Sequence, residues 1–245
     1  MNRIKALTLA AALCAGSLAM AADGGVLEMG KNYQPLEGPA IAPANPDPNK
    51  VEITEFMSYS CSHCRDFQPR IDRYAQTAMP KDAYWRDVHV VWNPTPDLAL
   101  AEVAAAMEIS QDRKGHEKYF EYVWQTDPQT GRPFHDLREI SQPDQVRQWA
   151  KSQKDWDASK FLQFYGTKKS AAEAKNMQQL TKKHGIMATP TIVVGGKYQV
   201  VVQDLGEKDF QVVTALVEKV KAERKQSVAL SPDFSKGGQI AKQGL

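Results

Sequence analysis

Two cysteines spaced C-x-x-C, with a strand pattern before them and a helix pattern after them, constrain this sequence most. Residues 51–59 are dense in β-branched and aromatic residues, which predicts a strand. After the cysteines, apolar residues recur at the spacing of one helix face, namely Phe67, Ile71, Tyr74, Ala75 and Ala78. Cys61 and Cys64 are therefore expected where a strand ends and a helix begins.

This junction predicts a reactive thiol. Ser60 is the expected N-cap, which places Cys61 in the first turn of the helix. Unpaired backbone N–H groups and the helix dipole favour an anion there. The thiolate is the nucleophile in thiol–disulfide exchange, so Cys61 should react readily, and a protonated His63 would add a second favourable charge. A redox-active dithiol is the interpretation that we favour.

Other roles for a C-x-x-C pair fit less well. A structural disulfide across so short a loop would contribute only about 2 kcal/mol, against about 4.7 kcal/mol for a loop of about 100 residues. A structural zinc site usually needs a second pair of ligands, and the sequence has no second cysteine pair. Haem attachment needs C-x-x-C-H, but Arg65 follows Cys64. Two unrelated buried thiols are the remaining alternative. We expect no metal, and no cofactor beyond the Cys61–Cys64 disulfide.

Residues 1–21 have the pattern of a secretory signal peptide. Arg3 and Lys5 precede an apolar run, and the triplet AMA at residues 19–21 fits a cleavage site. The apolar run is too short to span a membrane. Cleavage would discard Cys14, so the exported protein would keep Cys61 and Cys64 as its whole cysteine inventory in an oxidising compartment. The chain is therefore predicted to be exported from the cytosol.

Charge gives no indication of a polyanionic partner. The full sequence has 31 Lys and Arg residues against 29 Asp and Glu residues, and the signal peptide carries two of the bases and none of the acids. The exported chain would be formally neutral, so we expect neither nucleic-acid binding nor binding to an anionic membrane, and no membrane-embedded segment.

The rest of the chain divides into regions of different pattern. Residues 22–50 are rich in proline and read as an extended lead-in, with a short edge strand at 33–36. A second strand is expected at 88–92, in which His89 fits a core or edge histidine better than a catalytic one. Residues 96–184 are almost wholly helical in pattern, with Gly115 as an expected separator between two helices. The aromatic residues there have core spacing.

The pattern returns to strands after Gly185. Two β-rich runs, 191–194 and 197–202, are joined by Gly195-Gly196, which predicts a hairpin. Pro190 stands at the start of the first run, where its missing N–H costs nothing. A final helix is expected around residues 210–220, followed by a flexible tail over 226–245.

Glu55 is the acidic residue closest to the cysteines within the strand. It shares the strand phase of apolar Ile53 and Met57. Two interpretations stay open, an ordinary exposed carboxylate and a buried acid below the dithiol that holds or relays a proton as Cys64 ionises.

Taken together, these motifs resemble the DsbA family of periplasmic disulfide oxidoreductases over roughly residues 30–225. The resemblance is carried by two clusters, E55-F-x-S-x-x-C61-x-H-C64 and G185-x-x-x-T189-P-T-x-x-x-G195-G-K-Y. It implies an α/β thioredoxin-like fold interrupted by an all-helical insertion domain. The thioredoxin-like domain would comprise residues 51–95 and 185–225, and the insertion residues 96–184.

The resemblance also implies roles for individual residues. Cys61 would be the exposed nucleophile and Cys64 the buried resolving thiol. His63 would stabilise the Cys61 thiolate, and Glu55 would be the buried acid. The remaining roles fall to Pro190, as a cis proline packed against the dithiol, to Thr189, in contact with the substrate backbone, and to Ser62, within the pair that helps to set the reduction potential.

The function predicted on this basis is donation of the Cys61–Cys64 disulfide to newly exported proteins. The resemblance implies reduced or unfolded exported proteins as substrates and a DsbB-like, quinone-linked membrane partner that reoxidises the dithiol. One alternative is a disulfide isomerase or reductase of the same fold, to which Ser62 and Thr189 lend some weight. The other is a non-catalytic, chaperone-like module that binds peptides.

Overall fold

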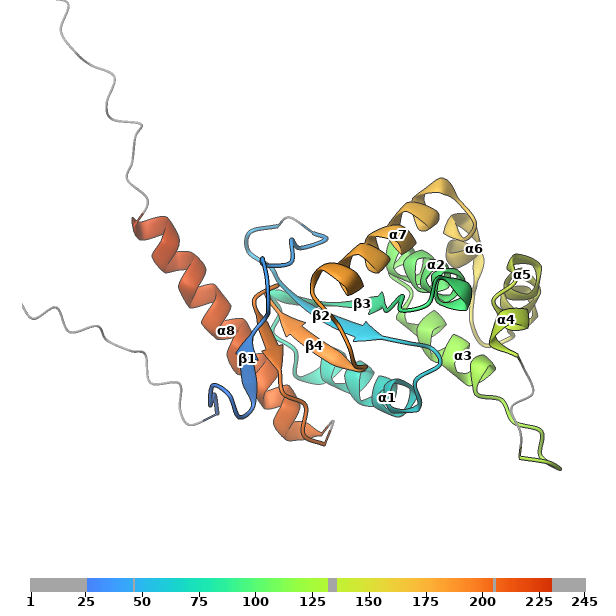
Figure 1. Cartoon of the computed structure of the whole chain (residues 1–245), viewed down its shortest axis with the longest axis horizontal. Helices are drawn as coiled ribbons and strands as arrows, with labels where there is room; N and C mark the ends of the chain where they lie inside the picture. The colour runs from blue at the N-terminus through green and yellow to red at the C-terminus, as the bar shows by residue number, and fades with distance from the viewer. Residues whose placement is uncertain (1–25, 46, 132–135, 205, 231–245) are drawn as a thin grey trace, which may run out of the picture.

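A five-stranded sheet forms the centre of the part of the chain that the computed structural model describes, residues 26–45, 47–131, 136–204 and 206–230 (Figure 1). The spatial order of the strands is β1-β5-β4-β2-β3, with β2 and β3 parallel and all other neighbours antiparallel. The strands are β1 (Tyr33–Pro35), β2 (Val51–Met57), β3 (Ala83–His89), β4 (Thr191–Val194) and β5 (Tyr198–Val200). The predicted edge strand is thus present as β1.

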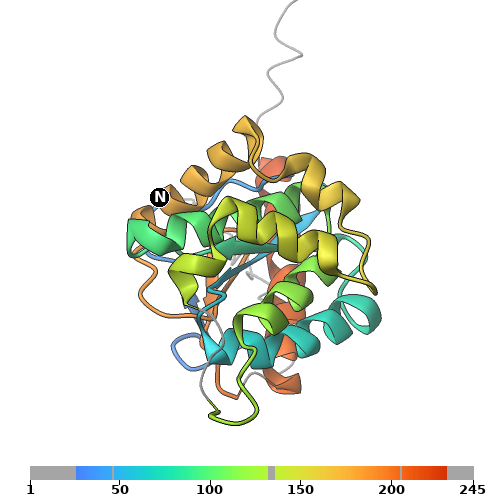
Figure 2. The same ribbon diagram turned by 90° about the vertical axis from the view of Figure 1, so that its right-hand side faces the viewer.

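Helices cover both faces of the sheet. The helices are α1 (Ser62–Thr77), α2 (Pro94–Ser110), α3 (Arg113–Val123), α4 (Leu137–Ile140), α5 (Pro143–Ser152), α6 (Ser159–Phe164), α7 (Lys168–Lys183) and α8 (Glu207–Leu230). α1 and α8 share one apolar core with the sheet, and α2 and α7 share the other. Figure 2 looks onto the helical segment, with the green to yellow helices α2 to α7 in front of the sheet. The expected interruption of the sheet by a helical block is therefore present.

The central position of β2 explains its composition. Every residue of β2 is buried, because both faces of the strand are covered by helices. A strand buried on both faces reads as a continuous run rather than as a strict alternation. Glu52, Thr54 and Glu55 are nevertheless part of it, so these polar side chains must find partners inside the protein.

Strand β3 begins five positions earlier than the sequence pattern predicts, at Ala83 rather than Val88, and ends at His89. Arg86 and Asp87 obscure its first half in the sequence, since charged residues weaken a strand pattern. In the structure both are buried and paired, and the register from Val51↔Ala83 to Met57↔His89 holds the whole strand against β2.

The hairpin predicted after Pro190 is present. Gly195 and Gly196 have φ values of 61° and 68°, as a two-residue turn of this type requires, and the N–H of Lys197 donates to the carbonyl of Val194 at 3.1 Å. Its second strand is shorter than expected and ends at Val200.

Gly115 does not separate two helices, contrary to the prediction. It lies inside α3, and the break falls at Gln111, which ends α2 in the left-handed conformation with φ 55°. Packing explains the glycine: a Cβ atom at Gly115 would lie 2.2 Å from the sulfur of Met107 and 2.8 Å from the ring of Trp156. The residue allows α2 and α3 to approach closely, which sequence spacing alone does not reveal.

The last helix is longer than predicted, since α8 continues to Leu230, into the segment assigned to a flexible tail. The predicted signal peptide, Cys14 and the remainder of that tail lie outside the described residues. No helix among the described residues combines the length and apolar character needed to cross a membrane.

Candidate active site

Cys61 is the N-cap of α1, whereas the sequence predicted Ser60 as the N-cap and Cys61 in the first turn. Its Sγ accepts a hydrogen bond from the backbone N–H of Cys64 at 3.4 Å. Ser60 does not cap the helix because its hydroxyl pairs with that of Ser58 at 2.9 Å. The sulfur therefore takes the place of a capping oxygen, directly at the positive end of the helix dipole.

The loop before β4 closes the other side of the sulfur. Cys61 Sγ lies 3.4 Å from the carbonyl oxygen of Thr189, and the Thr189–Pro190 peptide bond is cis. Two segments that are 128 positions apart in the sequence thus meet at one thiol. Cys61, Cys64 and Thr189 are brought together here, and the cis Pro190 follows Thr189 directly. The packing of Pro190 against the dithiol stays a prediction.

The environment lowers the pKa of Cys61 from an ordinary value of 9.0 to about 5. The hydrogen bond from the Cys64 thiol contributes most, and burial partly opposes it. A hydrogen bond with the Thr189 side chain and the backbone N–H groups of Cys64 and His63 lower the pKa further. Each of these groups favours the charged form of the sulfur. At neutral pH Cys61 is therefore a thiolate, the form that attacks disulfides.

Cys64 differs from Cys61 in both its burial and its pKa. It is buried, whereas Cys61 is partly exposed. Its hydrogen bond with Cys61, burial and the nearby Glu55 all raise its pKa, so Cys64 keeps its proton in the reduced form. One sulfur is thus an accessible nucleophile and the other a sheltered thiol.

Glu55 is a buried acid below this pair. Its side chain is fully buried, and Oε2 has no hydrogen-bond partner among the described residues. Burial raises the pKa of Glu55 well above its ordinary range, and the charge of Asp87 on the adjacent strand raises it further. Of the two interpretations of Glu55, the geometry supports the buried acid, whose raised pKa favours the protonated form.

This chain is similar to known proteins that exchange thiols and disulfides. The Thioredoxin family model matches residues 47–226. The oxidoreductase NmDsbA1 from N. meningitidis is 31% identical, with a TM-score of 0.67 and coverage of 82% of this chain and 97% of that chain. The oxidoreductase NmDsbA3 from Neisseria meningitidis is 34% identical, with a TM-score of 0.67, and it is covered over its whole length, against 81% of this chain.

The chain belongs to the DsbA family of thiol:disulfide oxidoreductases. A curated relative, the thiol:disulfide interchange protein DsbA of Pseudomonas aeruginosa, is 26% identical over 228 residues, which cover 90% of this chain and 99% of that protein. The enzyme is therefore a disulfide oxidoreductase with a thioredoxin-like fold and a helical insertion.

Two of the residues that the DsbA resemblance implies lie between the cysteines. His63 is exposed, and its backbone N–H is the group that acts on the Cys61 sulfur. Ser62, the first residue of α1, is partly exposed. The roles of the His63 and Ser62 side chains in this DsbA-family protein stay predictions.

Sequence reasoning missed the residue that anchors the active-site loop, Tyr59. Its backbone N–H donates to His89 Nε2 at 3.1 Å, its carbonyl accepts from Trp124 Nε1 at 2.8 Å, and its hydroxyl pairs with His116 Nδ1 at 2.9 Å. Burial lowers the pKa of His89 to about 3, so His89 stays neutral and accepts this bond. His89 is thus a core histidine, as predicted. Its isolated position in a strand gave no indication that it holds the loop before Cys61.

Proposed function

We propose that this DsbA-family enzyme donates the Cys61–Cys64 disulfide to reduced proteins that have been exported to the periplasm. The observation that carries the proposal is the opposite state of the two thiols, a thiolate at Cys61 with a pKa of about 5 and a protonated, buried Cys64. Stabilising the Cys61 thiolate stabilises the reduced enzyme. A dithiol whose reduced form is stabilised gives up its disulfide more readily, so it acts as an oxidant.

The transfer follows from this geometry in two exchanges. A substrate thiolate attacks the exposed Cys61 Sγ, and the bond to Cys64 breaks. A second substrate thiolate then attacks the substrate sulfur of the mixed disulfide, and Cys61 departs as a thiolate. Since the rate of exchange rises as the pKa of the leaving thiol falls, the low pKa of Cys61 speeds this second step. The substrate loses two electrons, and the enzyme gains them.

Exposed apolar side chains on the loop that leads to Thr189, and against it, support an extended or unfolded substrate. Met187, two residues before Thr189, is 86% exposed, and Trp92 is 50% exposed. The Trp92 indole N–H donates to the carbonyl of Ile186 at 2.7 Å, which keeps the ring on the same loop. Exposed apolar side chains on a loop that also contacts the reactive thiol fit a partner whose own apolar residues are not yet buried.

The proposal includes a location and a second partner. The signal-peptide pattern over residues 1–21 supports export to the periplasm. The reduced dithiol would be reoxidised by a DsbB-like, quinone-linked membrane protein. The enzyme itself would use no cofactor other than its disulfide, bind no nucleic acid and remain outside the membrane.

Equilibration of the purified protein with glutathione buffers tests the proposal. We expect the Cys61–Cys64 pair to be more oxidising than glutathione, and we expect Cys61→Ser to lose exchange entirely. A strongly reducing potential would overturn the donor role in favour of a reductase or isomerase. Exchange retained in Cys61→Ser would overturn the assignment of the nucleophile.

A further inference from the structure

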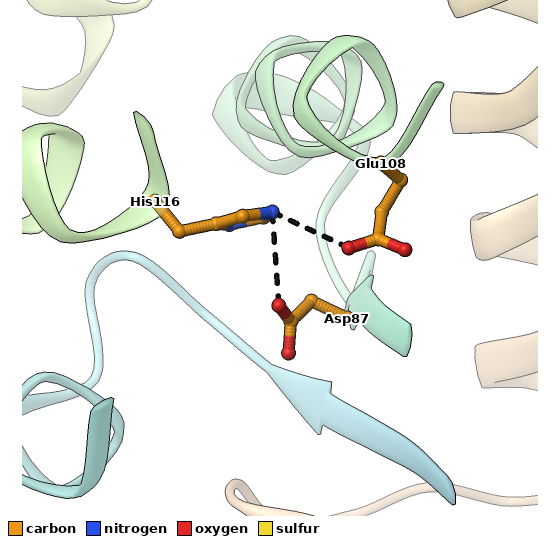
Figure 3. A group of neighbouring side chains, drawn as sticks. All are labelled: Asp87, Glu108 and His116. Carbon is orange, nitrogen blue, oxygen red and sulfur yellow. Dashed lines mark ion pairs between the residues drawn. The ribbon is translucent and has the colours of Figure 1, made fainter. Parts of the chain in front are cut away.

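A buried cluster next to Glu55 is not used by the exchange described above. Asp87 of β3, Glu108 of α2 and His116 of α3 point toward one another (Figure 3). His116 Nε2 lies 3.7 Å from Asp87 Oδ2 and 3.5 Å from Glu108 Oε1. This nitrogen is buried and has no hydrogen-bond partner among the described residues, although two carboxylates lie within 4 Å of it.

The cluster is continuous with the acid below the dithiol. Glu55 and Asp87 are register partners on the parallel strands β2 and β3. Asp87 raises the pKa of Glu55, and the hydrogen bond with Glu55 lowers the pKa of Asp87. Burial opposes the ionisation of Asp87, but Arg113 and His116 outweigh it and lower its pKa. Two buried carboxyl groups this close do not both ionise readily, so the pair holds one proton, mainly on Glu55.

The other end of the cluster reaches solvent. Glu108 is about one-fifth exposed and lines a cavity of about 520 Å³ together with Arg113 and Glu173. Burial raises the pKa of Glu108, which favours a carboxyl group that can carry a proton. Glu55 and Asp87 are fully buried. A proton that leaves Glu55 therefore has a route through titratable side chains to the cavity.

Three ligand-type atoms within 4.8 Å of one another could also suggest a metal site. The charges argue against it. The Arg113 guanidinium Nη1 already lies 3.3 Å from Asp87 Oδ2, so a divalent cation at the cluster would stand next to a fixed positive charge. The Nδ1 of His116 is engaged by the Tyr59 hydroxyl.

We propose that Asp87, His116 and Glu108 form a proton route between Glu55 and the cavity. This route replaces the proton that Glu55 gives to Cys64 when the disulfide is reduced. The inference rests on the proposed function only for the direction of exchange. Other titratable or charged groups that face the route are Tyr59, Asp72 of α1, His89 of β3, Asp112 at the N-cap of α3, and Arg113 of α3.

The proton balance is as follows. When the substrate thiolate attacks Cys61, the Cys61–Cys64 bond breaks and the Cys64 sulfur leaves with the electron pair. It takes the proton of Glu55. The Glu55 carboxylate regains a proton from Asp87, which receives it from His116 Nε2, and His116 is reprotonated by Glu108. Glu108 takes a proton from water in the cavity, and the two substrate thiols have released two protons to solvent.

Glu108→Gln tests the route at its solvent end. We expect it to slow reduction of the enzyme disulfide by dithiothreitol at neutral pH by about tenfold, less than the roughly 10²–10⁴-fold of a group that transfers the proton directly, because Glu108 acts through other side chains. Added acetate, a carboxylic acid small enough for the cavity, should restore part of the rate. Rapid-mixing tryptophan fluorescence, measured across pH, gives both quantities.

Glu173→Gln is the matched control, because Glu173 lines the same cavity but pairs with Arg86 rather than with the cluster. We expect it to keep the wild-type rate and pH profile, and we expect Glu108→Asp to keep most of the rate. These three outcomes together would support the route.

Several results would overturn the route. One is a Glu108→Gln enzyme with the wild-type rate and pH profile. Another is a slower enzyme that acetate does not rescue and whose free energy of unfolding has fallen, since that is a structural effect. Calorimetric binding of Zn²⁺ that is lost in Glu108→Gln would assign the cluster to a metal. The Cys61–Cys64 pair could also prove strongly reducing while its rate of reduction still depends on Glu108. That result would overturn the donor role but support the proton route.

Discussion

At the scale of single residues, the two cysteines differ because of four hydrogen-bonding groups around Cys61 and one buried acid near Cys64. Cys61 is partly exposed and receives hydrogen bonds from Cys64, while Cys64 is buried above Glu55. Both thiols belong to one C-x-x-C motif, and the motif alone does not distinguish them. Their chemistry is set by what each sulfur faces.

The first prediction concerns the Cys61 thiolate. Its folded-state pKa of about 5 lies below the ordinary value of 9.0, so the thiolate stabilises the reduced enzyme fully above about pH 9. This contribution declines below that pH and is lost as pH falls through 5. Thiolate absorbance should titrate near pH 5 in the reduced enzyme and be missing in Cys61→Ser. Reduced and oxidised enzymes whose relative stability does not change with pH would contradict the prediction.

The second prediction concerns the hydroxyl of Thr189. Thr189→Val keeps the shape of the side chain but removes its hydrogen bond with Cys61. We expect the pKa of Cys61 to rise by about one unit, because a hydrogen bond to a charged group contributes about 1.5 kcal/mol. The potential should become less oxidising.

Thr191→Val provides the comparison, since the Thr191 hydroxyl donates to Ala188 at 2.9 Å and belongs to the same loop end. Absorbance titration of both variants measures the effect. An equal shift in the two variants would show that the loop, rather than the Thr189 hydroxyl, acts on the sulfur.

At the scale of elements, the hairpin and the proline-rich lead-in form one unit. The Ile41 N–H donates to the Gly196 carbonyl at 2.9 Å, and the Leu36 N–H donates to Lys197 at 2.7 Å. A Cβ atom at Gly196 would lie 2.1 Å from the carbonyl oxygen of Ile41. The glycine is therefore required by its positive φ and by a close backbone approach.

The third prediction follows from this contact. Gly196→Ala should lower the free energy of unfolding by about 3 kcal/mol, since the left-handed conformation costs a residue with a Cβ about 1–2 kcal/mol and the contact with backbone adds to it. Gly131→Ala is the control, because Gly131 has φ 65° and, apart from its chain neighbours, no atom of the described residues lies within 4 Å of an added Cβ. It should cost only about 1 kcal/mol. Urea unfolding of the two variants separates the contributions, and equal losses would rule out the backbone contact.

At the scale of the whole molecule, Arg86 connects the sheet to the helical segment. Its guanidinium lies 3.3 Å from Glu52 of β2 and 2.6 Å from Glu173 of α7. Arg86 and Glu52 are almost fully buried, so neither charge is compensated by water. Removal of one member leaves the other without its counter-charge.

The fourth prediction tests this connection. Arg86→Met should reduce the free energy of unfolding by about 3 kcal/mol or more, and adding Glu52→Gln should recover part of the loss. Lys31→Met removes an exposed pair with Glu28 and should change stability by less than about 1 kcal/mol. Urea unfolding provides the measurement. A loss in Arg86→Met no larger than in Lys31→Met would refute a role for this buried pair.

The sequence by itself determined the order of elements and the reactive thiols. Strand, C-x-x-C, helix, helical block, Gly-Gly hairpin and last helix are all present, because local periodicity and turn chemistry depend on neighbouring residues. The same local information placed Cys61 at a helix start. It could not decide between Ser60 and Cys61 as the cap, since that depended on the bond between Ser58 and Ser60.

Only the tertiary structure decided what surrounds the thiols. The contact of Cys61 with Thr189, the pairing of Glu55 with Asp87, and the meeting of Asp87, Glu108 and His116 all join segments far apart in the chain. It also decided that Gly115 is a packing residue and that His89 anchors Tyr59. Proton affinity depends on burial and on neighbouring charges, and both are properties of the folded chain rather than of any stretch of its sequence.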